Sequence, residues 1–169
     1  MSEFLLEDRI IELARRVVEE NRAAGRRISL AESCTGGLVS AALTEIPGSS
    51  AVLDRAWVTY SNEAKSECLG VSGDLIDAFG AVSIACVYAM AQGALERSDA
   101  DVAVAISGIA GPEGGSEQKP VGTVVFARAR RGVDRPFAES RRLGDKDGSW
   151  TRAEIRRQAT ICALELLLP

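Results

Sequence analysis

The first candidate for chemistry is a run of small and polar residues, Glu32-Ser33-Cys34-Thr35-Gly36-Gly37, between a predicted strand and a predicted helix. A serine at such a place lies in the positive field of the helix N-terminus, which favours an alkoxide or a bound anion. The two glycines let the backbone turn tightly and expose its N–H groups. Ser33 is therefore a candidate nucleophile, with an ordinary helix-capping serine as the alternative and Cys34 as a rival nucleophile.

The absence of histidine decides what could activate such a nucleophile. It excludes Ser-His-Asp and Cys-His catalytic sites, histidine-ligated metals and histidine acid–base chemistry. A serine nucleophile then needs another base, and a lysine serves when burial or a nearby positive charge lowers its pKa. Lys65 ends the run Tyr60-Ser61-Asn62-Glu63-Ala64-Lys65, and the only other lysines are Lys119 and Lys146. Lys65 is the candidate base, with a solvated helix lysine as the alternative.

A glycine-rich stretch, Ser107 to Gly122, follows the most apolar predicted strand. Glycine-rich turns after a strand present backbone N–H groups to an anion, and long loops in compact domains are often functional. The stretch matches neither a P-loop nor a dinucleotide-binding G-x-G-x-x-G, and a structural loop is the alternative. An arginine near such turns clamps a phosphate or carboxylate, although a solvated helix face accounts for most of the arginines in the C-terminal part. These are Arg141, Arg142, Arg152, Arg156 and Arg157.

Length and composition narrow the classes further. The chain of 169 residues suits one domain, and 46% apolar with 26% charged residues is an ordinary globular balance. The net charge of −4 argues against a nucleic-acid or membrane-surface binder, and no stretch reaches the roughly 18 apolar residues of a membrane span. The four cysteines form no C-x-x-C pair, which argues against a zinc site or a redox dithiol. We expect a soluble protein of the reducing cytoplasm that needs no metal and no cofactor.

The elements that must position these residues alternate between strand and helix. The residue pattern predicts helices over 4–22, 38–46, 72–78, 83–95 and 149–168, and a turn that leads into a short helix over 61–70. It predicts strands over 27–32, 56–60, 101–106, 122–129 and, at an edge, 136–143. Such alternation is typical of layered α/β proteins. The strands around 101–129 are joined without an obvious helix, which favours a mixed sheet. We expect a single domain over residues 1–169, an α/β/α sandwich with a mixed central sheet and with Ser33 at the end of its strand.

Five runs together resemble the CinA C-terminal domain family, and the resemblance extends from about residue 8 to residue 168. The runs are AESCTGG (31–37), VTYSNEAK (58–65), GAVS (80–83), ISGIAGPEGGSEQKPVGTV (106–124) and RRQATICALELL (156–167). Stand-alone members of this family are metal-free serine/lysine amidohydrolases. The resemblance implies that the chain hydrolyses the carboxamide of nicotinamide mononucleotide to nicotinic acid mononucleotide and ammonia.

The resemblance also implies roles for single residues. Ser33 is the nucleophile, Lys65 is the base, and Tyr60 and Ser107 line the substrate pocket. For the oxyanion we expect backbone N–H groups near Thr35-Gly36-Gly37 or Ser107-Gly108. Lys65 must then be partly buried with a lowered pKa, and its nitrogen must lie within hydrogen-bond reach of the Ser33 oxygen.

One segment departs from the family pattern. Family members often have a compact Gly-Asp-Arg closely followed by an apolar-Arg pair that opens the last helix. This chain carries about six additional residues between Gly144 and Arg156, so that Arg152 becomes the candidate for a phosphate or ribose contact and Lys146 a second one. We expect a small-molecule nucleotide as the partner, a homo-oligomer, and neither nucleic acid nor membrane. A non-catalytic nucleotide- or pyrophosphate-binding module is the alternative function.

Overall fold

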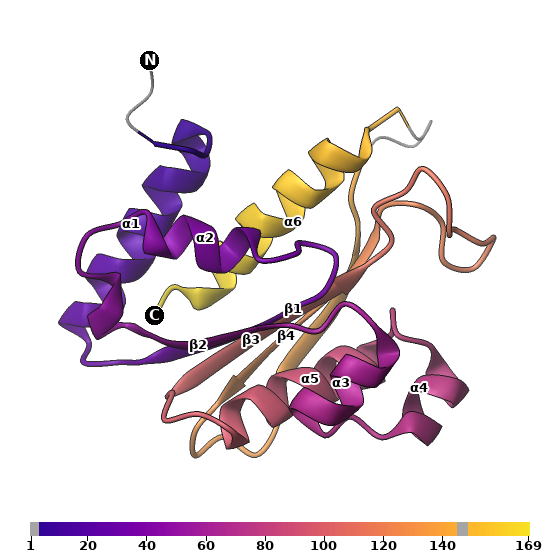
Figure 1. Cartoon of the computed structure of the whole chain (residues 1–169), viewed down its shortest axis with the longest axis horizontal. Coiled ribbons are helices and arrows are strands. Elements are labelled where there is room, and N and C mark those ends of the chain that lie inside the picture. The colour runs from indigo at the N-terminus through magenta and orange to yellow at the C-terminus, as the bar shows by residue number, and fades with distance from the viewer. Residues whose placement is uncertain (1–3, 145–148) are drawn as a thin grey trace.

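The computed structural model describes residues 4–144 and 149–169, and its centre is one mixed β-sheet (Figure 1). Within these residues the sheet has five strands in the order β2-β1-β3-β4-β5. The strands are β1 (Ile28–Glu32), β2 (Leu53–Val58), β3 (Val102–Gly108), β4 (Thr123–Arg130) and β5 (Phe137–Arg142). β1 pairs in parallel with β2 and β3, whereas β4 pairs antiparallel with β3 and β5. The predicted mixed sheet is confirmed.

Helices cover both faces of this sheet (Figure 1). One face carries α1 (Asp8–Ala23), α2 (Leu38–Thr44) and α6 (Arg152–Leu167). The other carries α3 (Asn62–Leu69), α4 (Gly73–Phe79) and α5 (Ile84–Glu96). The predicted α/β/α sandwich is therefore confirmed.

The central strand β3 shows why two layers of helices form. Its side chains alternate between the faces, and both sets are buried. Val102, Val104 and Ile106 belong to the core under α1 and α6, whereas Ala103 and Ala105 face α5. Because alanines line that second face, α5 can lie close to the sheet.

The predicted boundaries differ from the structure in a few places. The first helix begins at Asp8 rather than at residue 4, and a short 3-10 helix, η1 (Ser49–Ala51), was not expected. β2 covers 53–58 instead of 56–60, because the chain leaves the sheet after the Thr59 N–H donates to the Glu32 carbonyl. The Ser61 hydroxyl then caps α3 by accepting from the Ala64 N–H at 3.0 Å.

The three parallel strands end at the same edge of the sheet. Ser33 directly follows β1, Thr59 and Tyr60 follow β2, and Ser107 and Gly108 close β3. Ligands of open α/β sheets bind beyond the carboxyl ends of such strands. The fold therefore gathers the candidate residues at one place, although they lie far apart in sequence.

Candidate active site

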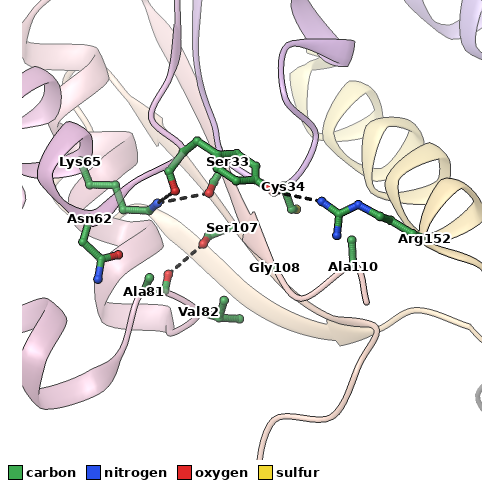
Figure 2. A pocket seen from close by; sticks show the side chains of 11 residues that line it. Ser33, Cys34, Asn62, Lys65, Ala81, Val82, Ser107, Gly108, Ala110 and Arg152 are labelled. Atoms are coloured by element: carbon green, nitrogen blue, oxygen red, sulfur yellow. Dashed lines mark hydrogen bonds between the residues drawn. The ribbon is translucent and has the colours of Figure 1, made fainter. Parts of the chain in front are cut away.

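A cavity of about 210 Å³ lies at this edge of the sheet (Figure 2). It brings together most of the residues that the sequence singles out. Its lining consists of Ser33, Cys34, Tyr60, Asn62, Lys65, Ala81, Val82, Ser107, Gly108, Ala110 and Arg152.

Lys65 lies at the floor of this cavity and is only 1% exposed. Its Nζ lies 3.2 Å from the Ser33 Oγ. Figure 2 shows the two side chains directed toward each other. The same nitrogen donates to the carbonyls of Thr59 at 2.8 Å and Tyr60 at 3.3 Å. Side chains in the first turn of a helix point back toward its N-terminus, which carries the Lys65 ammonium from α3 to these carbonyls and to Ser33.

Burial lowers the pKa of Lys65 from the ordinary lysine value of 10.5, while the nearby thiols of Cys86 and Cys34 act in the opposite direction. Desolvation disfavours the charged ammonium, so the neutral amine becomes accessible closer to neutral pH. A neutral Nζ can accept the proton of the Ser33 hydroxyl. The pair thus has the geometry and the electrostatics of a nucleophile and its base.

Cys34, the rival nucleophile, is also in the cavity lining but has different chemistry. Burial raises the pKa of its thiol to about 11, against the smaller opposing effect of the Arg156 charge. The thiolate is the nucleophilic form of cysteine, and it is disfavoured at neutral pH when the pKa is this high. Ser33 has the Lys65 amine 3.2 Å from its hydroxyl as a base, and this contact favours Ser33 over Cys34 as the nucleophile.

The turn after Ser33 is held by Glu32, a carboxylate with no exposed surface. Its Oε2 accepts from the Thr35 hydroxyl at 2.7 Å and from the Gly37 N–H at 3.0 Å, and its Oε1 accepts from the Ser40 N–H at 2.9 Å. The Gly36 N–H donates to the Ser33 carbonyl. Thr35, Gly36 and Gly37 are not among the described residues that line the cavity. The N–H groups of the two glycines, expected there for an oxyanion, donate instead to Glu32 and to the Ser33 carbonyl.

The end of β3 forms the opposite wall. The Ser107 hydroxyl donates to the Ala81 carbonyl at 2.8 Å and ties the loop after α4 to the sheet (Figure 2). A Cβ atom on Gly108 would lie 2.8 Å from Val124 Cγ2 and 3.1 Å from Cys34 Sγ, so a side chain has no room there. Ser107 and Gly108 both lie where the sequence places the pocket.

The mouth of the cavity is formed by Tyr60 and Arg152. The Arg152 guanidinium donates to the Tyr60 hydroxyl at 2.9 Å and to the Gly111 carbonyl at 2.7 Å, and so joins α6 to two loops. Arg152 opens α6, which begins with a capping box between Thr151 and Glu154. The second candidate for the phosphate contact, Lys146, lies outside the described residues.

The other arginines lie away from the cavity lining. Arg141 pairs with Glu139, and Arg157 pairs with Glu7. Arg156 instead donates to the carbonyls of the turn that carries Ser33.

Sequence reasoning assigned no role to several residues of the site. Glu32 belongs to the family-like run AESCTGG (31–37), and GAVS (80–83) is another such run. Their place in these runs is the sequence signal that points to them. Asn62, Ala81, Val82 and Ala110 complete the lining. Over residues 4–144 and 149–169, no group of three metal-ligating side chains could hold an ion. In the same part of the chain, every helix is too short or too polar to cross a membrane.

Comparison with known proteins identifies the family. The sequence model of the CinA C-terminal domain matches residues 10–169. The chain belongs to the CinA C-terminal domain family. A relative in Escherichia coli K12, named nicotinamide-nucleotide amidohydrolase PncC, is 47% identical over 166 residues, which cover 96% of this chain and 95% of that protein. The family prediction is confirmed.

Some relatives are much longer than this chain. A relative in Symbiobacterium thermophilum is 52% identical over 145 residues, which are 81% of this chain and 34% of that protein. A CinA-like protein of Mycobacterium marinum is 52% identical over 144 residues, which are 85% of this chain and 32% of that protein. This chain therefore spans about a third of the length of these two relatives.

Solved structures show the same fold. The competence/damage inducible protein CihA of Agrobacterium tumefaciens aligns with a TM-score of 0.91 at 49% identity, over 99% of this chain and 97% of that one. A CinA superfamily protein of Klebsiella pneumoniae aligns with a TM-score of 0.85 at 39% identity, over 94% of each chain. The α/β/α architecture is thus that of the CinA C-terminal domain family.

Proposed function

We propose that this chain is an amidohydrolase that converts nicotinamide mononucleotide and water to nicotinic acid mononucleotide and ammonia, with Ser33 as nucleophile and Lys65 as general base. The observation that carries the proposal is the 3.2 Å contact between Lys65 Nζ and Ser33 Oγ on the cavity floor. The name of relatives that are 46–47% identical over 96% of this chain supports the substrate.

Acylation begins from neutral Lys65. Three backbone carbonyls surround Nζ, those of Thr59, Tyr60 and Ser61. When the two N–H bonds of the neutral amine donate to the nearer two, of Thr59 and Tyr60, the nitrogen lone pair is left for the Ser33 O–H. Ser33 Oγ attacks the carboxamide carbon as its proton moves to Lys65 Nζ. The C–N bond then breaks, and Lys65 returns the proton to the leaving nitrogen, which departs as ammonia. The positively charged pyridinium ring withdraws electrons from the carboxamide and eases the attack.

The oxyanion formed in this step needs an N–H donor that the fold has not already used. In the antiparallel pairing of β3 and β4, the Ile109 N–H donates to the Thr123 carbonyl. Because alternate residues of a strand direct their N–H groups to opposite sides, the N–H of Gly108 is directed away from β4, toward β1 and the Ser33 turn. This supports the Gly108 N–H as an oxyanion donor.

In the hydrolysis of the acyl-enzyme, water takes the place of Ser33 as the nucleophile, and Ser33 Oγ becomes the leaving group. Lys65 takes a proton from water as the water oxygen attacks the ester carbon, and it returns that proton to Ser33 Oγ when the ester bond breaks. The products are the free Ser33 hydroxyl and nicotinic acid mononucleotide, whose carboxylic acid group releases its proton to water and becomes a carboxylate. Arg152, at the mouth, is the proposed contact for the phosphate of the nucleotide, because a guanidinium can donate two parallel hydrogen bonds to two oxygens of one phosphate.

Ammonia release from nicotinamide mononucleotide by the purified protein tests the proposal. We expect Ser33→Ala to lower the rate at least about 10³-fold while calorimetry still detects nucleotide binding. We expect prolonged chelation to leave the parent rate unchanged, since no step uses a metal. If the parent protein binds the nucleotide without releasing ammonia, it is the non-catalytic module instead.

Three further proposals accompany this function. We propose a homo-oligomer, a cytoplasmic location and a single domain over residues 1–169. Light scattering after size exclusion tests the first, cell fractionation the second and limited proteolysis the third.

A further inference from the structure

Two charged side chains, Glu32 and Arg156, hold the turn that carries Ser33, and the reaction steps above use neither. Glu32 accepts hydrogen bonds from the N–H groups at the far end of the turn. Arg156, from α6, donates through Nε to the Cys34 carbonyl at 3.0 Å and through Nη2 to the Thr35 carbonyl at 3.1 Å. The turn is thus held through its N–H groups by a carboxylate and through its carbonyls by a guanidinium.

The contact with Arg156 extends to the Ser33 peptide itself. A peptide group is planar, so holding the Thr35 carbonyl also sets the direction of the Gly36 N–H, which belongs to the same peptide group. That N–H donates to the Ser33 carbonyl at 3.0 Å. On its other side, the Ser33 N–H is anchored to the Ile106 carbonyl of β3. Arg156 therefore acts, through two peptide groups, on the backbone orientation that directs Ser33 Oγ toward Lys65.

We propose that Arg156 is a positioning residue for the amidase reaction, which holds the Ser33 turn so that Oγ stays within reach of Lys65 Nζ. The inference rests on the proposed function. It assigns two tasks to one face of α6, since residues four apart on a helix share a face. Arg152 reaches the mouth of the cavity, and Arg156 reaches the nucleophile turn.

The positive charge of Arg156 also acts on the thiol of Cys34, which lines the cavity. Burial raises the pKa of Cys34 to about 11, and the positive charge of Arg156 opposes this rise. A guanidinium is suited to this place because it stays charged and donates in a fixed fork to two acceptors. A lysine keeps the charge but lacks the fork, which makes Arg156→Lys an informative replacement.

Steady-state kinetics of Arg156→Ala and Arg156→Lys test the positioning role. We expect kcat to fall about 10- to 100-fold in both, because a displaced nucleophile slows the chemical step, with KM changed less than about twofold. Added guanidinium, far below unfolding concentrations, should restore part of the kcat of Arg156→Ala and not of Arg156→Lys. The matched control is Arg157→Ala, whose parent side chain is 47% exposed and pairs with Glu7, and whose kcat should equal that of the parent.

A parent-like kcat in Arg156→Ala would overturn the proposal. So would a loss that follows the unfolded fraction at the assay temperature and is not rescued by guanidinium. Both results would leave Arg156 as an anchor of α6 alone.

Amide hydrogen exchange provides a readout that does not need catalysis. In Arg156→Ala the Gly36 amide should exchange at least about 10-fold faster than in the parent, while the Val104 amide in the central strand stays unchanged. Unchanged exchange at Gly36 overturns the proposed hold on the turn even if the parent is active. If the parent releases no ammonia but Gly36 exchange responds as expected, the proposed function fails and the hold of Arg156 on the turn stands.

Discussion

The floor of the cavity and its mouth are built in different ways. The floor, together with the adjoining wall at the end of β3, presents the side chains of Ser33, Lys65 and Ser107, which are 8%, 1% and 1% exposed. Each follows or closes a strand of the sheet, or is bonded to backbone carbonyls next to one. The mouth consists of Tyr60 and Arg152, on exposed segments, and Tyr60 is 60% exposed. The proposed groups for chemistry are thus set by the folding of the core, whereas the proposed groups for substrate recognition lie at its surface.

This contrast separates two kinds of substitution. A change on the floor must disturb either a buried hydrogen bond or the space between packed strands, so it alters the chemical step. A change at the mouth leaves the core intact and alters how tightly the substrate binds. The variants below test this separation by following kcat and KM independently.

The largest effect is expected on the floor, from Lys65→Arg. Arginine keeps the positive charge but does not lose its proton in proteins, so it cannot act as a base. We expect ammonia release to fall about 10²- to 10⁴-fold, with the same loss in Lys65→Met. The pH profile of the parent provides a further check: activity should rise with pH through the lowered pKa of Lys65.

If Lys65→Arg kept more than about a tenth of the parent activity, the loss would be too small for the removal of a general base. Tyr60 would then become the leading candidate for that role.

The next effect is expected from Gly108→Ala, in the adjoining wall at the end of β3. The new methyl group would lie 2.8 Å from Val124 Cγ2 and 3.1 Å from Cys34 Sγ and from the Thr123 carbonyl oxygen. The strand end must shift to relieve these contacts, and the Gly108 N–H moves with it. We expect kcat to fall about 10²-fold, with a smaller change in KM.

Gly73→Ala is the matched control, because a Cβ at Gly73 at the start of α4 would meet no atom within 4 Å. Its kcat should equal that of the parent. An active Gly108→Ala protein would show that the wall formed by β3 takes no part in the reaction.

Sequence reasoning located much of the floor because its signals are local. A serine followed by two glycines between an apolar strand and a helix indicates a strand-end turn whatever the rest of the fold. The continuous apolar run of β3 likewise indicates a strand buried on both faces. Lys65 was harder to assign, since spacing alone fits a solvated helix lysine, and only the family resemblance and the fold place it beside Ser33.

Glu32 shows why the rest could not be predicted. Nothing in its neighbours indicates that its carboxylate turns back onto the N–H groups of Gly37 and Ser40 rather than toward solvent. That contact arises only when the turn and α2 are in place, and it engages the Gly37 N–H, whereas the Gly36 N–H donates to the Ser33 carbonyl. The role of Arg156 depends in the same way on a contact between residues 121 positions apart.

A smaller effect is expected at the mouth, from Arg152→Met. This variant removes the guanidinium next to Tyr60 without touching the core. We expect KM for the mononucleotide to rise about 10-fold, with kcat nearly unchanged, because a charge-assisted contact with phosphate is lost. The corresponding nucleoside, which lacks the phosphate, should show no change in KM.

Tyr60→Phe sharpens this measurement, since it removes only the hydroxyl that accepts from Arg152 at 2.9 Å. Its KM should rise less than that of Arg152→Met. An equal rise for nucleotide and nucleoside in Arg152→Met would remove Arg152 as the phosphate contact, and Lys146 would become the candidate.

The smallest effect is expected on folding stability, and it concerns Lys65 on the floor of the cavity. Because burial lowers the pKa of Lys65 below 10.5, the unfolded chain binds more protons than the folded chain between the two pKa values. Stability therefore rises with pH in that window, and below it the buried lysine carries its full cost. Lys65→Met has no ammonium to desolvate and fills nearly the same space. We expect it to be at least as stable as the parent at neutral pH.

Urea unfolding of parent and Lys65→Met over a range of pH values measures this difference. The advantage of the methionine variant should shrink as the pH approaches 10.5, where the unfolded lysine also loses its proton. The carbonyls of Thr59 and Tyr60 oppose this expectation, since removing Lys65 leaves them without that donor. A Lys65→Met protein less stable than the parent at every pH would mean that these hydrogen bonds outweigh the desolvation of the ammonium. If, in addition, the deficit of the methionine variant were largest at neutral pH and shrank as the pH rose above 10.5, the lysine would stabilise the fold in its charged form, and a floor built to hold a neutral amine would be wrong.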